Sequence, residues 1–186
     1  MTGFNDPFVI ARCLVNLLNP PKDAKIVDFG CGTGLCGIEL QKVGFTKIYG
    51  IDGSHDMLEI AKTKNIYKDA WVCLVGLDPL PEAVPLDCDI AVASAVMIKG
   101  HFPNTCYVEM LKTVISGGHI AFTIRDIYLD HATDNGMNFK DALEELEASG
   151  KMQLVKRERY VKYKGLAMGS GHQEEGANIL IYKKII

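Results

Sequence analysis

A glycine-rich turn after a short apolar run constrains this chain more than any other feature of its sequence. Residues Ile26 to Gly34 read I-V-D-F-G-C-G-T-G, so the acid Asp28 is followed by glycines at alternate positions, and a helical apolar pattern begins at Leu35. Glycine permits positive φ and close approach of the backbone to a ligand, and a helix N-terminus presents backbone N–H groups to anions. The segment predicts a buried strand, a tight turn and a helix start. We therefore expect a nucleoside-like cofactor at the first strand–helix crossover of an α/β sheet.

The spacing of the glycines bears on which cofactor is bound. The dinucleotide fingerprint is G-x-G-x-x-G or G-x-G-x-x-A. Here the sixth position counted from Gly30 is Leu35, and the third glycine comes one residue early. A second strand-like run, residues 47–52, ends in Asp52, and a carboxylate at such a strand end can accept hydrogen bonds from both ribose hydroxyls. The spacing disfavours an NAD-dependent oxidoreductase, and Asp52 is the expected ribose ligand.

The rest of the chain alternates between helical and strand-like patterns. Asp6 is a fitting N-cap for the first helix, and Pro7 suits the first helical position. Two β-rich runs near the C-terminus have no helix between them and indicate an antiparallel hairpin. The alternation predicts a mostly parallel, doubly wound sheet. Helices are expected at residues 7–18, 36–43, 56–64, 105–114 and 139–149, and strands at 25–29, 47–52, 71–75, 89–94, 119–125, 154–164 and 178–185.

Composition and charge fit one globular domain spanning residues 1–186. Hydrophobic residues make up 48% of the chain and charged residues 23%, which are ordinary globular values. The net charge of −3 gives no general attraction to nucleic acid or to anionic membranes. No apolar run approaches the ~20 residues of a membrane span, and no signal peptide is visible. We expect neither a membrane nor nucleic acid as a partner.

The six cysteines form no C-x-x-C pair, and most of them lie in apolar runs. This pattern predicts buried free thiols in a reducing compartment, which we expect to be the cytoplasm. It favours neither a disulfide framework nor a metal site. Cys31 lies inside the glycine turn, where it is either a small residue beside the cofactor or a redox-sensitive thiol.

The sequence D-x-G-x-G-x-G, taken together with the acid at Asp52, resembles motif I and the second-strand acid of the class I S-adenosylmethionine (SAM) dependent methyltransferases. The resemblance implies SAM as the cofactor, S-adenosylhomocysteine as the product, and a Rossmann-like fold with helices on both faces of a mostly parallel seven-stranded sheet that ends in an antiparallel hairpin. Residues 53–61 resemble the family's next helix, and residues 75–81 its segment under the adenine ring. Asp78 in that segment is either an adenine ligand or a turn cap before Pro79. The implied cofactor-binding residues are Asp28, Gly30, Cys31, Gly32, Gly34, Asp52, Gly53, Met57, Leu77, Asp78, Ala93 and Ser94.

Three later segments narrow the resemblance to the Williams–Beuren-region methyltransferase-like proteins. They are residues 74–81, 100–103 and 123–126. Members of this group usually carry further helical residues that help to roof the cofactor. This chain opens abruptly at Met1-Thr2-Gly3-Phe4. The roof is therefore expected to be either naturally short or cut away, which leaves one side of the cofactor open unless an added segment or a partner covers it.

The chemistry implied by SAM needs few protein groups. Its methyl group is already activated, so the enzyme must align the acceptor and exclude water, and it needs a general base only for a weakly acidic acceptor. No N-P-P-Y-type tetrad follows the fourth strand. His101 is the best candidate for a base, because histidine titrates near neutral pH. The alternative is an exposed loop histidine.

Other polar residues allow two interpretations each. Arg125 is a candidate for holding an acidic group of the acceptor, or it pairs with Asp126 or Asp130. A basic cluster in residues 151–164 either guides an anionic substrate or guards a sheet edge against aggregation. Three tyrosines either line a pocket or pack the strands, namely Tyr128, Tyr160 and Tyr163.

Three functions compete on these grounds. The favoured one is a SAM-dependent methyltransferase acting on an unidentified small molecule or protein. The second is a SAM-binding regulator or partner subunit without catalysis. The third, an NAD-dependent oxidoreductase, is disfavoured by the glycine spacing and by the terminal hairpin.

Overall fold

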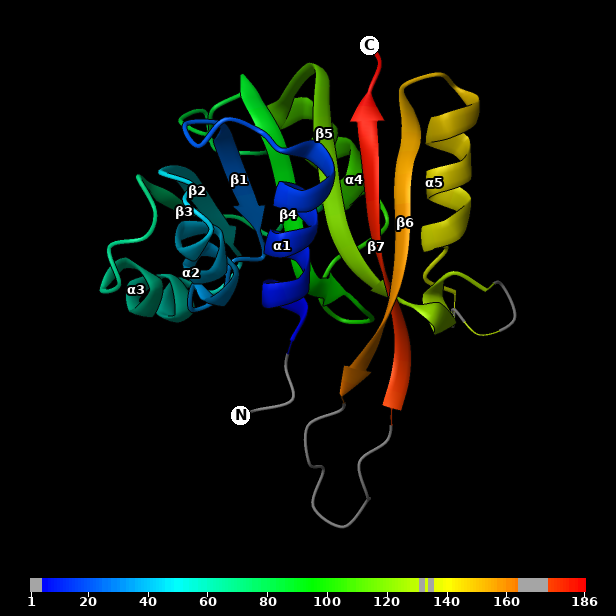
Figure 1. Ribbon diagram of the computed structural model, residues 1–186, viewed down its shortest axis with the longest axis horizontal. Helices are drawn as coiled ribbons and strands as arrows, with labels where there is room; N and C mark the ends of the chain where they lie inside the picture. The colour runs from blue at the N-terminus through cyan, green and yellow to red at the C-terminus, as the bar shows by residue number, and fades with distance from the viewer. Residues whose placement is uncertain (1–4, 131–132, 134–135, 164–173) are drawn as a thin grey trace.

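A computed structural model describes residues 5–130, 133, 136–163 and 174–186 of the chain. Its centre is a seven-stranded sheet with the strand order β3-β2-β1-β4-β5-β7-β6 (Figure 1). The expected fold class is confirmed. The strands are β1 (Lys25–Phe29), β2 (Lys47–Asp52), β3 (Ala70–Val72), β4 (Cys88–Met97), β5 (Val114–Arg125), β6 (Met152–Tyr163) and β7 (Glu174–Lys184), and the helices are α1 (Asp6–Leu18), α2 (Leu35–Lys42), α3 (His55–Lys62), α4 (Cys106–Thr113), the short 3-10 helix η1 (Asp126–Tyr128) and α5 (Phe139–Ala148).

The direction of the strands follows from how they are connected and buried. β1 to β5 pair in parallel, and β1 and β4 are almost continuously buried, as expected of strands covered on both faces. β7 lies between β5 and β6 and is antiparallel to both. The hairpin predicted from the two β-rich runs therefore extends the sheet beyond β5.

Two apolar cores lie on the two faces of this sheet. One contains residues of α1 and α2, such as Ile10, Leu14 and Leu40, and the other contains residues of α4 and α5, such as Tyr107 and Leu143. The carboxyl ends of the parallel strands point to the lower edge in Figure 1, where α1 also begins. Among the described residues, no helix combines the length and the apolar character needed to cross a bilayer.

Two predicted details are wrong, and both errors have a physical reason. β3 ends at Val72 instead of residue 75, because the chain turns there, and the carbonyl of Leu74 accepts the N–H groups of Leu77 and Asp78, at 2.9 Å each. Asp6 does not cap α1 but is its first residue, and its carboxylate accepts a hydrogen bond from Tyr160 at 2.6 Å.

β4 is longer than predicted and contains an unusual residue. It runs to Met97, with an irregular pairing to β5 between Ala93 and Met97. Ala95 in this stretch has a φ of 61°, in the left-handed region that side chains other than glycine rarely adopt. Its N–H donates to the hydroxyl of Thr123 on β5 at 2.7 Å, which holds the strained residue in place.

Candidate functional site

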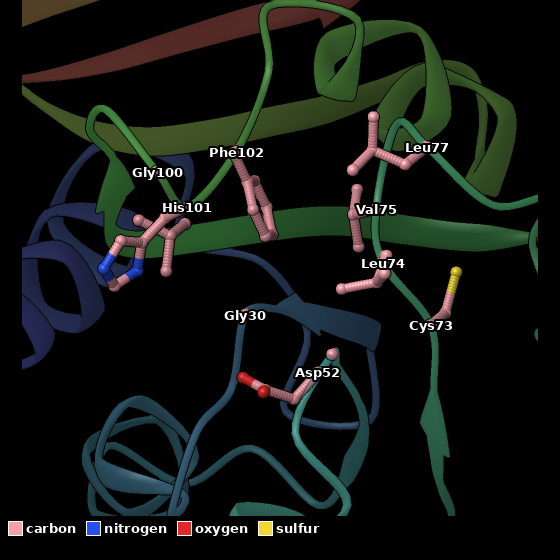
Figure 2. A pocket seen from close by; sticks show the side chains of 11 residues that line it. Gly30, Asp52, Cys73, Leu74, Val75, Leu77, Gly100, His101 and Phe102 are labelled. Carbon is pink, nitrogen blue, oxygen red and sulfur yellow. The ribbon is translucent and has the colours of Figure 1, made fainter.

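Two adjoining hollows open at the carboxyl ends of β1, β2 and β4. The larger, which we call the glycine-loop hollow, has a volume of about 400 Å³, and the smaller, the β3-side hollow, about 180 Å³. Both are lined by Gly30, Asp52, Val96 and His101, so they form one cleft. Figure 2 shows the β3-side hollow, with the ring of Phe102 pointing toward Gly30 and the carboxylate of Asp52 turned into the same space. The other lining residues are Pro7, Cys31, Gly32, Thr33, Leu35, Cys36, Ser54, Met57, Ser94 and Ala95 in the first hollow, and Gly53, Cys73, Leu74, Val75, Leu77, Gly100 and Phe102 in the second.

The glycine turn adopts the conformation that its sequence predicts. Gly30, Gly32 and Gly34 have φ values of 69°, 54° and 91°, all in the left-handed region. A Cβ atom built on Gly32 meets only the sulfur of Met57, at 3.8 Å, so this glycine leaves open space in the glycine-loop hollow. A Cβ atom on Gly30 would lie 2.6 Å from Cγ1 of Val96. Each of the three glycines thus permits the left-handed backbone that the turn requires. Gly32 also leaves space for a ligand.

Asp52 has a second role that its sequence position did not suggest. Its Oδ2 atom accepts the N–H of Gly32 at 2.7 Å, and its Oδ1 atom accepts the N–H of Ser54 at 2.8 Å. A carboxylate has about four acceptor positions, so both oxygens keep capacity for a ligand hydroxyl. The residue fixes the glycine turn to the end of β2 and faces the cleft at the same time.

Four of the predicted cofactor residues do not line either hollow. Asp28 is fully buried on β1 below the turn, and Ala93 is fully buried in the core. Gly34 faces Ile66 and Tyr67, with atoms 3.2 and 3.4 Å from a Cβ built on it. The carboxylate of Asp78 accepts the N–H of Leu74 at 3.1 Å, which matches the turn-cap alternative. A direct contact of these four residues with a cofactor stays a prediction.

The end of β4 presents a polar group to the glycine-loop hollow. Ser94 is only 8% exposed, and its hydroxyl has no hydrogen-bond partner among the described residues. Buried hydroxyls in native proteins nearly always have a partner. The orphaned hydroxyl therefore suits a polar ligand, as predicted for this residue.

The other predicted site residues lie where a ligand can reach them. Gly53, Met57 and Leu77 line the hollows, and the last two are largely exposed. His101 lies in the exposed loop after β4 and borders both hollows. Cys31 borders the glycine-loop hollow, but burial raises the pKa of its thiol far above the ordinary value. A protonated thiol is a poor nucleophile, so the structure supports the small residue and not the redox-sensitive thiol.

The tyrosines and arginines predicted as alternatives have mainly structural contacts. Tyr128 is buried against Phe139, and its hydroxyl accepts the N–H of Lys99 at 3.3 Å. The guanidinium of Arg125 lies 5.6 Å from the centre of the Tyr128 ring. Asp126, one predicted partner of Arg125, instead pairs with Arg159 at 2.8 Å.

Part of the basic cluster is also engaged within the hairpin. Arg157 donates to the side chain of Asn178, and Arg159 donates to Asp126. The side chain of Tyr163 lies outside the described residues, as do residues 1–4 of the short stretch expected before the first helix, Met1 to about Asp6.

The segment after the fourth predicted strand, residues 93–103, is expected to border the methyl donor, and Ala95, Val96 and Phe102 of this segment line the cleft. Ala95 is also the residue with a positive φ. Sequence reasoning missed Pro7, which reaches the glycine-loop hollow from the first turn of α1. The segment around residues 100–103 was a signal for Phe102, but alanine carries no sequence signal for positive φ.

Comparisons with known proteins agree with this geometry. The family described as "Methyltransferase domain" matches residues 20–177. Human methyltransferase-like protein 27 is 32% identical over 142 residues, which cover 76% of this chain and 55% of that protein. The chain thus spans about half the length of this curated relative, which is a Williams–Beuren-region protein of the kind that the sequence resembles.

Solved structures show the same fold. A TehB-like SAM-dependent methyltransferase from Corynebacterium glutamicum has a TM-score of 0.64 at 20% identity and covers 95% of this chain and 88% of its own. The YcgJ protein from Bacillus has a TM-score of 0.68 at 10% identity, with 96% and 99% covered. With the family match over most of the chain, the glycine turn and the acid at the end of β2, this chain belongs to the methyltransferase domain family.

Proposed function

We propose that this domain binds SAM in the two adjoining hollows and transfers its methyl group to an acceptor, leaving S-adenosylhomocysteine. The observation that carries the proposal is the junction of Asp52 with the glycine turn, because one carboxylate both fixes Gly32 and faces the cleft. The names of the human relative and of the Corynebacterium structure support the reaction class.

The residues present fit this cofactor. The space in front of Gly32 suits its methionine portion, the free capacity of Asp52 suits its ribose hydroxyls, and the hydroxyl of Ser94 is a partner for a polar group. Met57 and Leu77 provide exposed apolar surface for the adenine ring. When bound, SAM supplies an activated methyl group. The chain's own residues have to orient the acceptor and keep water away.

We expect the acceptor to approach at the His101 end of the cleft. A small cavity of about 10 Å³, room for one water, shares Ala95 with the glycine-loop hollow. Arg125 and Tyr160 border it. Arg125 is the candidate for an acidic group of the acceptor, and His101 the candidate base if the acceptor needs one.

Calorimetry with SAM, S-adenosylhomocysteine and NAD tests the cofactor assignment. We expect the first two to bind and NAD not to bind. A folded protein that ignores SAM, or that binds NAD as well as SAM, would contradict the proposal.

Turnover separates the enzyme from a SAM-binding regulator. Methyl-labelled SAM is incubated with a metabolite library and with lysate fractions, and label transfer and S-adenosylhomocysteine are measured together. The acceptor that gives both identifies the substrate. Labelling that persists after Gly32→Val abolishes SAM binding would instead come from a contaminating enzyme.

We also propose that the protein works in the cytoplasm. The six cysteines are buried free thiols, which suits a reducing compartment. Expression of a tagged chain followed by fractionation tests this proposal.

A further inference from the structure

Tyr67 contacts the base of the glycine turn without lining the cleft. It lies in the loop between α3 and β3, and its hydroxyl donates a hydrogen bond of 2.8 Å to Oδ2 of Asp28. Asp28 is fully buried on β1, two residues before the turn begins at Gly30. The bond therefore connects a distant loop to the strand end that carries the turn.

Three glycines make room for this one side chain. A Cβ atom built on Gly37 of α2 would lie 2.6 Å from the hydroxyl oxygen of Tyr67, and Cβ atoms on Gly50 of β2 and Gly34 would lie 3.3 and 3.4 Å from its ring. Glycine inside a helix or a strand is destabilising unless something must pass close to the backbone. Gly37 and Gly50 hold such positions: Tyr67 passes close to both, together with Ile66 at Gly37 and the sulfur of Cys31 at Gly50.

The surroundings of Asp28 make its charge depend on this contact. Burial raises the pKa of Asp28 to about 7, while the hydrogen bond from Tyr67 opposes that rise. The other titratable groups facing it are Cys36, Cys31 and Asp52, and burial keeps both thiols protonated by raising their pKa values. Burial also raises the pKa of Tyr67, so this hydroxyl remains a donor at every physiological pH.

The charge of Asp28 acts on the cleft although the residue does not line it. Asp28 interacts electrostatically with Asp52 and Cys31, which both border the glycine-loop hollow. Interactions between charges are stronger in a protein interior than in water. The sulfonium of SAM is positive, whereas the thioether of S-adenosylhomocysteine is neutral, so a carboxylate here distinguishes the two.

We propose that Tyr67 is a positioning residue of the cofactor site, whose hydroxyl stabilises the negatively charged form of Asp28 beneath the glycine turn and thereby favours SAM over S-adenosylhomocysteine. The proposal rests on SAM binding in the cleft, as proposed above.

The test measures the affinity of both ligands by calorimetry from pH 5.5 to pH 9 in the wild type and in Tyr67→Phe. In the wild type we expect the preference for SAM to rise with pH as Asp28 ionises. In Tyr67→Phe this rise moves to higher pH, because the bond that favours the carboxylate is gone. The preference at pH 7 falls about fivefold, as expected for a pKa raised by about one unit, and recovers by about pH 9. Any titration of the ligands themselves affects the wild type and the variant equally, so it does not contribute to the difference between them.

Three further variants sharpen the result. Tyr107→Phe removes a buried hydroxyl that has no hydrogen-bond partner among the described residues, and it should leave the pH profile unchanged. Asp28→Asn should abolish this part of the pH dependence. If Tyr67→Phe does not fold, Gly37→Ala provides the same test, because the added methyl group pushes the hydroxyl away from Asp28 in a helix that otherwise prefers alanine.

The outcomes separate this proposal from the proposed function. A wild type that binds neither ligand would refute both. A wild type that binds SAM, with Tyr67→Phe showing the same pH profile or an equal loss for both ligands at every pH, would overturn the positioning role alone.

Discussion

The hydroxyl of Tyr160 donates a hydrogen bond of 2.6 Å to the carboxylate of Asp6, although the two residues are 154 positions apart in the sequence. Asp6 is fully buried at the start of α1, and Tyr160 lies on β6 at the edge of the sheet. Tyr160 borders the same small cavity as Thr123 on β5, whose hydroxyl accepts the N–H of the strained Ala95. The terminal hairpin thus lies beside Ala95, which lines the glycine-loop hollow.

Replacing Tyr160 by Phe should lower the free energy of unfolding by about 2 kcal/mol, because a buried carboxylate loses a hydrogen-bond donor. Urea unfolding measures the change. Tyr107→Phe is the matched control, since its buried hydroxyl has no partner among the described residues, and we expect it to be close to neutral. Equal effects of the two variants would mean that the bond to Asp6 adds nothing.

Gly32→Val should abolish SAM binding while leaving the fold in place. The new side chain would occupy the glycine-loop hollow beside Met57. The left-handed φ of Gly32 adds backbone strain of about 1–3 kcal/mol. Calorimetry and thermal unfolding report the two effects separately.

Gly150→Val is the control for that strain. Gly150 has a φ of 71°, follows α5, and a Cβ atom built on it meets nothing within 4 Å. It should lose similar stability and keep its SAM affinity. Normal SAM binding by Gly32→Val would mean that the turn is purely structural.

Asp52→Ala should weaken SAM binding by about 2–4 kcal/mol, because a charged acceptor for the ribose hydroxyls is removed. Part of this loss comes from Gly32 and Ser54, whose N–H groups also lose their acceptor. Asp56→Ala makes the same change of charge on α3, where the side chain is fully solvent-exposed and lines neither hollow, and should leave affinity unchanged. Unaltered SAM affinity in Asp52→Ala would refute the ribose assignment.

Gly176→Ala should disrupt the ion pair between Asp126 and Arg159, because a Cβ atom at this position overlaps both side-chain ends. The pair is partly exposed, so we expect a loss of about 0.5–1 kcal/mol. Hydrogen bonds from Arg159 and Asn178 lower the pKa of Asp126 despite some burial. Its stabilisation is therefore complete above the ordinary pKa of about 4 and disappears as pH falls through the lower folded value. The difference in the free energy of unfolding between wild type and variant should shrink below about pH 4. If this difference persists at lower pH, backbone strain at residue 176 and not the lost ion pair would be its cause.

Asp28→Asn should change how stability depends on pH. The folded pKa of Asp28, about 7, lies above its ordinary value because of burial. The folded state therefore holds an extra proton between about pH 4 and pH 7, and the wild type loses stability as pH rises through that window. Asparagine does not titrate, so the variant should gain about 2–4 kcal/mol relative to the wild type between pH 5 and pH 8. If the free energies of unfolding of the two proteins changed with pH in parallel, the raised pKa of the buried Asp28 would be contradicted.

Much of the fold followed from local pattern in the sequence. The apolar runs of β1 and β2 and the glycine turn between β1 and α2 predicted those elements at nearly their observed bounds. The early end of β3 came from a local turn, whereas two other differences came from tertiary contacts. Asp6 has the right chemistry for a cap, but a tyrosine on β6 binds it, and Ala95 bends β4 because Thr123 holds its N–H.

The site was also predicted in outline, because the spacing of its motifs is a local pattern in the sequence. Motif spacing identified Gly32, Asp52 and Ser94, which do line the cleft. It does not say which residues face inward, and Asp28 proves to be buried against Tyr67. The three glycines near that tyrosine lie 17 to 33 positions before it in the sequence, so their proximity to it is visible only in three dimensions.

The position of β7 between β5 and β6 has a consequence for synthesis on the ribosome. β5 can join the parallel strands as it emerges, but its neighbour in the sheet, β7, is made only after β6. β6 is made earlier and has no place in the sheet until β7 arrives to pair with both. The hydrogen bond between Asp6 and Tyr160 also forms only after β6 has been made, so α1 gains this contact late. Contacts between segments so distant in sequence form slowly, and the nascent domain would expose the edge of β5 until β7 has been made.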